Sequence, residues 1–406
     1  MKNVVSKLVE DAYVPKMFKV RQKFARPKIE VADIPAEVKK ELSKPEISGQ
    51  IKPGMRIAIT AGSRGVANIA LITEAIVSFC KEKSAVPFII PAMGSHGGAT
   101  AEGQLELLKG YGITEKTMGC PIYSSMEVVK IGQTDSGLDV KIDKYAAESD
   151  GIIAANRIKP HTCYRGTYES GLMKMLAIGV AKQAGAEVCH EAGFKNMAKN
   201  VPIFGKAIIK YAPVICALGI IENAYDETCH IEAVNACDIE GREPDLLKLA
   251  FSRMPKILVD ECDVLVVDYI GKNFSGDGMD PNITGTFCTP YASGGIKSQH
   301  VAVLSLSEET HGNASGIGTS SAITRRAFEQ MDFDATYPNC ITSTALNAAR
   351  VPMVMKNDKE CIQLCLRACI ETDKKRPRVV RIPNSLMLEY IMLSEALYDT
   401  AKHIRI

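Results

Sequence analysis

The sequence predicts an α/β protein, because short apolar segments alternate with helical patterns along its 406 residues. Residues 55–60 follow a turn signal formed by Pro53 and Gly54 and have the uninterrupted apolar character of a buried strand. A helical pattern covers residues 68–83, and a second apolar segment, 86–91, comes after it. This order of strand, helix and strand is typical of a sheet with helices on its faces.

The same alternation continues along the chain and gives the predicted sheets a polar edge. Further strands are expected at residues 151–155, 214–221, 263–268 and 301–306. Polar or glycine-containing loops follow several strands at their carboxyl ends, where α/β folds bind ligands. We expect the functional residues in these loops, which cover residues 61–65, 94–98, 156–171 and 271–285.

The chain is long enough for two or three domains. A helical pattern is interrupted at Pro255, so we place a domain junction near residue 258. We expect an N-terminal catalytic domain over residues 1–258 and a second α/β domain over residues 259–384, with the active site in the cleft between the two. The last segment, 385–406, has an amphipathic helical pattern and is expected to join the first domain.

The composition excludes several classes of protein. A net charge of +2 without a long basic run argues against a nucleic-acid surface. The N-terminus has no apolar core of signal-peptide length and no apolar stretch approaches a membrane span, so we expect a cytoplasmic protein without a membrane partner. The thirteen cysteines, an odd number at irregular spacings, do not form a disulfide pattern. Cys361, Cys365 and Cys369 have helical spacing and are expected to face a core.

Three of the seven histidines are candidates for proton transfer or metal binding. His96 lies between Ser95 and two glycines, just after a predicted strand. There it could be a general acid or base at the mouth of a pocket, or a loop histidine that caps the next helix. His190 is a single imidazole standing apart from the other histidines, and is a poor metal site by itself.

His161 follows a proline at the end of another predicted strand. Lys159 and Arg165 lie near it in sequence and suit a carboxylate or phosphate ligand, although a salt-bridged surface loop explains them equally well. Lys174 stands at a predicted helix start among apolar neighbours. A partly buried amine there would be a nucleophile, and the alternative is a lysine whose stem packs while its amine reaches solvent.

Two loops offer groups for binding a substrate. The segment 271–285 alternates acidic residues with glycine but lacks the final glutamate of a calcium loop, so a polar substrate-binding loop is expected. The segment from Gly62 to Gly65 is too short for a P-loop, yet Arg64 at a strand end could hold a carboxylate or phosphate.

In chain order these segments are Gly62-Ser63-Arg64, Gly94-Ser95-His96, Pro160-His161, Lys174 and His190. Their order and spacing resemble the nickel-dependent lactate racemase family, with its 2-hydroxy-acid racemase and epimerase relatives, over most of residues 50–200. The resemblance implies that the N-terminal domain binds a nickel-pincer nucleotide. This cofactor is pyridinium-3,5-bisthiocarboxylic acid mononucleotide, whose two thiocarboxyl groups chelate nickel.

The resemblance also implies a role for each matching residue. His96 and His161 would be paired acid/base histidines. Lys174 would tether the cofactor covalently, and His190 would complete the nickel coordination. The nucleotide phosphate and the substrate would be lined by Ala61, Gly62, Ser63 and Arg64.

The chain departs from the family pattern in three places. The family's acidic loop before the first arginine reads Thr60-Ala61-Gly62-Ser63 here. The lysine segment is longer, which makes Lys182 a second candidate for the tether. A glutamine and lysine pair that binds substrate has no clear copy, and its place could be taken by Lys272, Asn282 and Thr284, or by Lys297 and Gln299.

These implications predict a racemase or epimerase of a 2-hydroxy acid that transfers hydride to and from the cofactor through a 2-oxo acid. Proteins of cofactor biosynthesis would be partners, because they make and load the cofactor in this family. Two alternatives stay open. One is a zinc-dependent lyase or hydrolase that uses His96, His161 and His190. The other is a non-catalytic protein that binds a small anion on the same scaffold.

Overall fold

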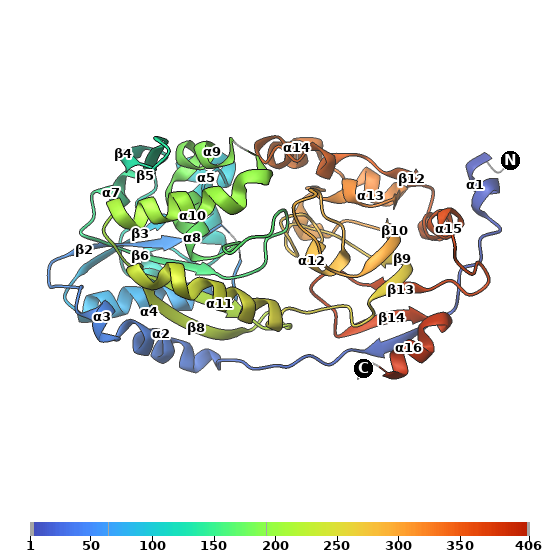
Figure 1. The fold of residues 1–406 in the computed structure, drawn as a ribbon, viewed down its shortest axis with the longest axis horizontal. Coiled ribbons are helices and arrows are strands. Elements are labelled where there is room, and N and C mark those ends of the chain that lie inside the picture. The colour runs from blue at the N-terminus through green and yellow to red at the C-terminus, as the bar shows by residue number, and fades with distance from the viewer. Residues whose placement is uncertain (1–3, 64, 192, 404–406) are drawn as a thin grey trace. The chain divides into compact units, whose positions relative to one another are not determined.

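The computed structural model describes residues 4–63, 65–191 and 193–403. The chain folds into two compact units (Figure 1). One unit comprises Arg26–Met254, and the other is built from the described residues up to Ala25 and from Pro255 onward. The boundary before Pro255 lies beside the junction predicted near residue 258. Both units have the α/β architecture that the sequence predicts.

The Arg26–Met254 unit is built on a five-stranded sheet with the order β3-β2-β6-β7-β8. The first four strands are parallel, and β8 pairs antiparallel with β7. Their apolar residues run without interruption because helices cover both faces of the sheet. The bounds are β2 Arg56–Ala61, β3 Val86–Pro91, β6 Gly151–Arg157, β7 Val214–Glu222 and β8 Thr228–Asn235.

Alternate residues of each strand enter two separate cores in this unit. Ala58 belongs to one core, and its neighbours Ile57 and Ile59 belong to the other, because successive side chains of a strand point to opposite faces. The core that contains Ile57 packs against α2 (Ile34–Leu42) and α4 (Ile69–Glu82).

The core on the Ala58 side packs against α10 (Phe194–Tyr211) and α11 (Ile239–Arg253). It also covers a helical segment made of α8 (Leu172–Lys174), a π-helix (Met175–Val180) and α9 (Lys182–His190). The remaining elements of the unit are α3 Pro45–Ser48, α5 Ala101–Gly110, α6 Glu115–Met118, α7 Lys144–Ala147 and the antiparallel pair β4 Val128–Gln133 and β5 Asp139–Asp143.

The other unit contains a seven-stranded sheet with the order β1-β14-β13-β9-β10-β11-β12. Strands β13, β9, β10, β11 and β12 are parallel to one another. The strand bounds are β1 Met17–Arg21, β9 Glu261–Val267, β10 Lys297–Val303, β11 Ala322–Thr324, β12 Met353–Met355, β13 Val379–Ile382 and β14 Tyr390–Ser394. The helices are α1 Val4–Val9, α12 Pro281–Thr284, α13 Arg325–Glu329, α14 Phe333–Thr342, α15 Asp358–Ala368 and α16 Tyr398–His403.

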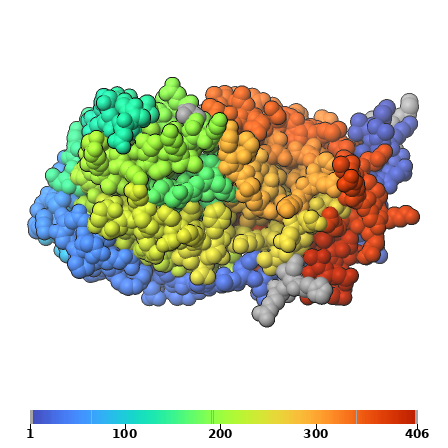
Figure 2. Space-filling view, in the orientation of Figure 1, coloured from blue at the N-terminus to red at the C-terminus, as the bar shows by residue number. Residues whose placement is uncertain are grey.

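The expectation that residues 385–406 form a helix on the first domain is wrong, apart from the short helix α16 near its end. Part of this segment is strand β14, which pairs antiparallel with β13 and β1 inside the seven-stranded sheet. Ile391 and Leu393 are buried and Tyr390 is exposed, so the segment has the two-residue period of a strand rather than a helical period. Figure 2 accordingly shows the blue N-terminal residues beside red C-terminal ones, so the first 25 residues do not belong with the predicted domain 1–258.

The cysteine stripe of α15 is a core face, as the sequence predicts. Cys361, Cys365 and Cys369 are buried in one cluster with β9 and β10 residues such as Val264 and Ala302. Burial raises the pKa of Cys361 to about 12, which keeps this thiol protonated and unreactive. Among the described residues, no helix has the length and apolarity needed to cross a membrane.

Candidate active site

The sheet order brings three predicted site segments to one edge of the Arg26–Met254 unit. Strand β2 lies between β3 and β6, and all three are parallel. Gly62 and Ser63 follow β2, His96 follows β3, and His161 follows β6. Since neighbouring strands lie about 4.8 Å apart, β3 and β6 flank the Gly62 segment at about 10 Å from each other. The two histidines therefore leave the sheet on either side of that segment.

His96 lies in a tight loop and is hydrogen-bonded to the segment after β2. Its Nδ1 contacts the Oγ of Ser63 at short range. Ser63 is held in turn by Tyr111, whose hydroxyl donates to the Ser63 carbonyl at 2.7 Å. The next helix, α5, is capped by Thr100, which accepts the Gly103 N–H at 3.0 Å. The alternative in which His96 caps that helix is therefore wrong.

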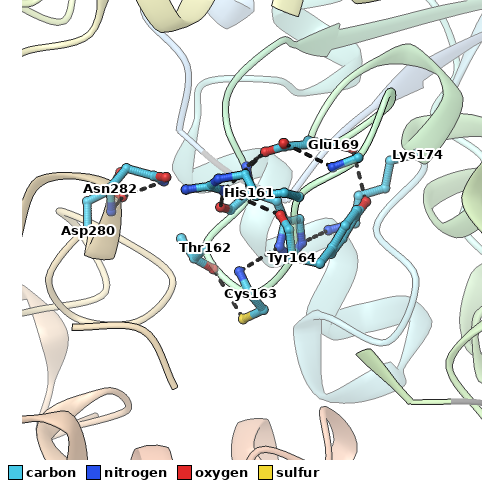
Figure 3. Close-up of polar contacts among 10 residues, drawn as sticks. His161, Thr162, Cys163, Tyr164, Glu169, Lys174, Asp280 and Asn282 are labelled. Carbon is cyan, nitrogen blue, oxygen red and sulfur yellow. Dashed lines mark hydrogen bonds and ion pairs between the residues drawn. The ribbon is translucent and has the colours of Figure 1, made fainter. Parts of the chain in front are cut away.

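The loop of His161 is organised around a buried carboxylate (Figure 3). Glu169 is 2% exposed and accepts the His161 N–H at 2.6 Å. Arg165 donates to the His161 carbonyl at 2.7 Å and pairs with Glu169 at 3.3 Å. Burial raises the pKa of Glu169 against the opposing effects of the backbone N–H groups and of Arg165. Arg165 is thus part of the loop's own framework rather than of a surface salt bridge.

The hydrogen bonds of His161 define which ring nitrogen carries the proton. The Cys163 N–H donates to Nδ1 at 3.0 Å, so Nδ1 is an acceptor. A neutral imidazole with that tautomer has its proton on Nε2. Nε2 lies 2.7 Å from the Nζ of Lys174, which must then accept this hydrogen bond through an amine lone pair. The geometry thus favours a neutral, nucleophilic Lys174, whose half-buried side chain directs its amine to His161.

A second buried carboxylate caps the helical segment that carries Lys174. Glu243 of α11 is 1% exposed and accepts the Met173 N–H at 2.8 Å. Burial raises its pKa to about 7, although the N–H groups of Leu172 and Met173 act in the opposite direction. Gly171 precedes the segment because a Cβ there would lie 2.0 Å from Glu243 Oε1.

The second candidate tether, Lys182, is not available to a ligand. It is fully buried, and its Nζ lies 3.1 Å from Asp143 Oδ2. Gly62 packs close to the Lys174 segment, since a Cβ on it would lie 3.3 Å from the Met175 methyl carbon. Ala61 is buried at the end of β2. Arg64 and the side chain of His190 lie outside the described residues, so their predicted roles stay predictions.

The predicted substrate residues of the other unit do not all lie together. Lys272 follows the carboxyl end of β9, and its Nζ donates to the Gly276 carbonyl at 2.6 Å. Asn282 donates to Asp280 at 2.9 Å, and Thr284 is fully buried and donates to the Asp280 carbonyl at 3.1 Å. Lys297 begins β10 and pairs with the amino end of β9, so it lies at the sheet edge opposite to Lys272. Gln299 likewise lies within β10 and accepts the Ile370 N–H at 3.0 Å.

The chain is thus an α/β protein in which His161 contacts Lys174, and His96 contacts the segment after the intervening strand β2. Residues 8–201, just under half of the chain, match the family described as the lactate racemase N-terminal domain. The match points to the racemase and isomerase class. No curated protein sequence matches the chain.

The fold is similar to the solved structure of the lactate racemase apoprotein from Thermoanaerobacterium thermosaccharolyticum. The TM-score is 0.54 at 15% sequence identity, and the match covers 91% of this chain and 94% of that one. At this identity the similarity concerns the fold. It agrees with the resemblance that the ordered histidine and lysine segments predict.

Proposed function

We propose that the protein racemises or epimerises a 2-hydroxy acid with the help of a nickel-pincer nucleotide attached to Lys174. The observation that carries this proposal is the 2.7 Å contact between Lys174 Nζ and His161 Nε2, beside a segment that His96 flanks from the other side. One base on each side of a reacting carbon is what inversion of a stereocentre needs. The family match of residues 8–201 supports the same class of reaction.

The described residues fit this cofactor at the tether. Attachment requires an uncharged amine, and the hydrogen bond from His161 makes Lys174 an acceptor. Gly62 and Gly94 let their loops pack closely against the helical segment of the tether, since a Cβ on either would lie 3.3 Å from Met175 or Ile178. His190, at the end of α9, is proposed as the nickel ligand on the resemblance alone. When bound, the cofactor would accept the substrate hydride and return it.

The protein's own residues would move the protons. Attachment at Lys174 removes the amine lone pair, so His161 Nε2 loses its acceptor and can exchange a proton with the substrate hydroxyl. His96 would do the same for the opposite enantiomer through Nε2, because its Nδ1 is bonded to the Ser63 hydroxyl. Glu169 holds the His161 backbone, and Glu243 holds the helix of Lys174.

The zinc alternative is less compatible with this geometry. Both ring nitrogens of His161 take part in hydrogen bonds, to the Cys163 N–H and to Lys174. Metal coordination through His161 would require one of these bonds to break. We therefore assign His161 to proton transfer.

To test the proposal, the protein is produced together with the proteins that make and load the cofactor, and is then purified. We expect stoichiometric nickel, a mass adduct on the peptide that contains Lys174, and loss of optical purity in at least one member of a panel of chiral 2-hydroxy acids. Lys174→Gln should lose the adduct and the activity, whereas Lys199→Gln, an exposed lysine on α10, should keep both. Purified protein that contains zinc but no adduct would exclude the proposal. The absence of an adduct after production with the loading proteins would exclude it as well.

A further inference from the structure

Beneath the His96 loop lies a buried polar network formed by Lys182, Gln104 and Asp143. All three side chains are fully buried. The ammonium of Lys182 donates to the Pro91 carbonyl at 2.6 Å and to Gln104 Oε1 at 3.1 Å, and it lies 3.1 Å from Asp143 Oδ2. Two of the three donors of the ammonium therefore have hydrogen-bond acceptors, and the Asp143 carboxylate lies within ion-pair distance.

Gln104 connects this ion pair to the loop. Its Nε2 donates to the Gly94 carbonyl at 3.1 Å and to the His96 carbonyl at 3.2 Å. Its Oε1 faces Lys182, so both hydrogens and the oxygen of the amide are in use and its orientation is defined. The network therefore holds the backbone of His96 itself.

The network also holds the loop against the helical segment of the tether. Lys182 begins α9 directly after the π-helical turn and has a positive φ of 54°. Gly94 has a φ of 57° and donates its N–H to the Gly179 carbonyl at 3.3 Å. π-Helical turns are rare and occur frequently at functional sites. The His96 loop and the Lys174 segment are thus joined by this backbone hydrogen bond and by the Lys182 side chain.

A buried ion pair is a costly way to stabilise a core. Burial raises the pKa of Asp143 and lowers that of Lys182, so both charges are held against a desolvation cost that only their mutual attraction and hydrogen bonds offset. Apolar residues of similar volume would stabilise such a core at least as well. The retained polarity is better explained by the position it imposes on the groups it contacts.

We propose that Lys182, Gln104 and Asp143 form a positioning network that fixes His96 relative to the Lys174 segment. Gln104 and Lys182 are positioning residues in this assignment, since both are fully buried and contact the backbone of the His96 loop and of Pro91 before it. The inference rests on the proposed function for the statement that His96 moves protons. The fixed position of His96 does not depend on it.

The test compares Gln104→Met, which keeps the side-chain length without the amide, with Ser149→Ala. Ser149 is a matched control because its buried hydroxyl also contacts two carbonyls, those of Ala146 and Gly151, at the amino end of β6. The probe is carbethoxylation of His96 by diethyl pyrocarbonate in cofactor-free protein, followed by peptide mass spectrometry from about pH 5.5 to about pH 8.5. His230, hydrogen-bonded to Glu232 on β8, is the internal reference.

We expect Gln104→Met to change the rate of the His96 reaction at least about threefold or to shift its pH midpoint, with His230 unchanged, and Ser149→Ala to leave His96 as in the wild type. If Gln104→Met does not fold, Gln104→Asn, whose amide is one methylene short, is expected to give the same result. In loaded enzyme, Gln104→Met should lower kcat with little change in KM.

An unchanged His96 reaction in a folded Gln104 variant would overturn the positioning network, and so would an equal change in Ser149→Ala. The two proposals fail separately. A changed His96 reaction in a protein that racemises no 2-hydroxy acid would leave the network standing and remove the proposed function. Racemisation by a protein whose His96 reaction is unchanged in the Gln104 variant would keep the proposed function and remove the positioning network.

Discussion

Replacing Gly171 with alanine tests whether Glu243 holds the helical segment that carries Lys174. A Cβ at this position would lie 2.0 Å from Glu243 Oε1, so the carboxyl group would have to move. The backbone of Gly171 is extended, with a φ of −178°, and alanine adopts it without strain. The effect of the substitution therefore comes from the displaced carboxyl group.

The expected size follows from the groups that lose their partner. Displacement leaves the buried N–H groups of Leu172 and Met173 without an acceptor. Each costs about 1–3 kcal/mol, and the smaller entropy of the unfolded alanine chain offsets about 0.5–1 kcal/mol, so the net loss is about 1–5 kcal/mol. The free energy of unfolding should be measured at about pH 6. There Glu243, with a pKa of about 7, is mostly protonated, so its buried charge contributes little to the difference between the two proteins.

The assay is urea unfolding followed by circular dichroism, together with hydrogen exchange of the amides of residues 172–180. Exchange in that segment should become faster in Gly171→Ala. The control is Gly241→Ala, at an exposed position of α11, where a Cβ has no atom within 4 Å. It should gain up to about 1 kcal/mol from helix propensity. A Gly171→Ala protein within about 0.5 kcal/mol of wild type, with unchanged exchange, would refute the capping role of Glu243.

Further predictions concern pH and the two histidines. The pKa of Glu243 is about 7 in the folded protein against an ordinary 4.5, so its stabilising effect is complete below pH 4.5 and is lost as pH rises through 7, by at most about 3 kcal/mol. Glu243→Gln should remove this dependence in melting temperatures measured across that range, and an unchanged slope would contradict the assignment. His161→Phe removes the donor to Lys174, so acylation of Lys174 at about pH 7, read by mass spectrometry, should slow about tenfold, and equal rates would count against a neutral amine. Ser63→Ala removes the hydrogen bond to His96 Nδ1 and should lower kcat for racemisation about tenfold with KM nearly constant. A change confined to KM would instead assign Ser63 to substrate binding.

The buried parallel strands could be predicted well, whereas the edge strand β1 and its neighbour β14 could not. The apolar segments 86–91 and 151–155 correspond to β3 and to most of β6, because strands covered on both faces need no polar alternation. Strands β1 and β14 pair across the whole length of the sequence. No local pattern indicates such a pairing, and for this reason residues 385–406 were expected to form a helix.

The residues that do the chemistry carry local signals, whereas those that position them do not. His96 and His161 stand out because each follows an apolar strand at a glycine or proline. Glu169 could have been found, since it lies four residues after Arg165 and pairs with it. Glu243 caps a helix segment 70 positions earlier in the chain, and such a contact exists only in the folded protein.

The two lysines show most clearly where spacing stops being informative. Lys174 and Lys182 belong to one helical segment, and sequence alone offers both as tethers. The π-helical turn and the left-handed backbone at Lys182 break the regular rotation between them. One amine therefore meets His161, and the other meets Asp143 and Gln104. A single irregular turn thus gives one lysine to the proposed chemistry and the other to the loop that positions His96.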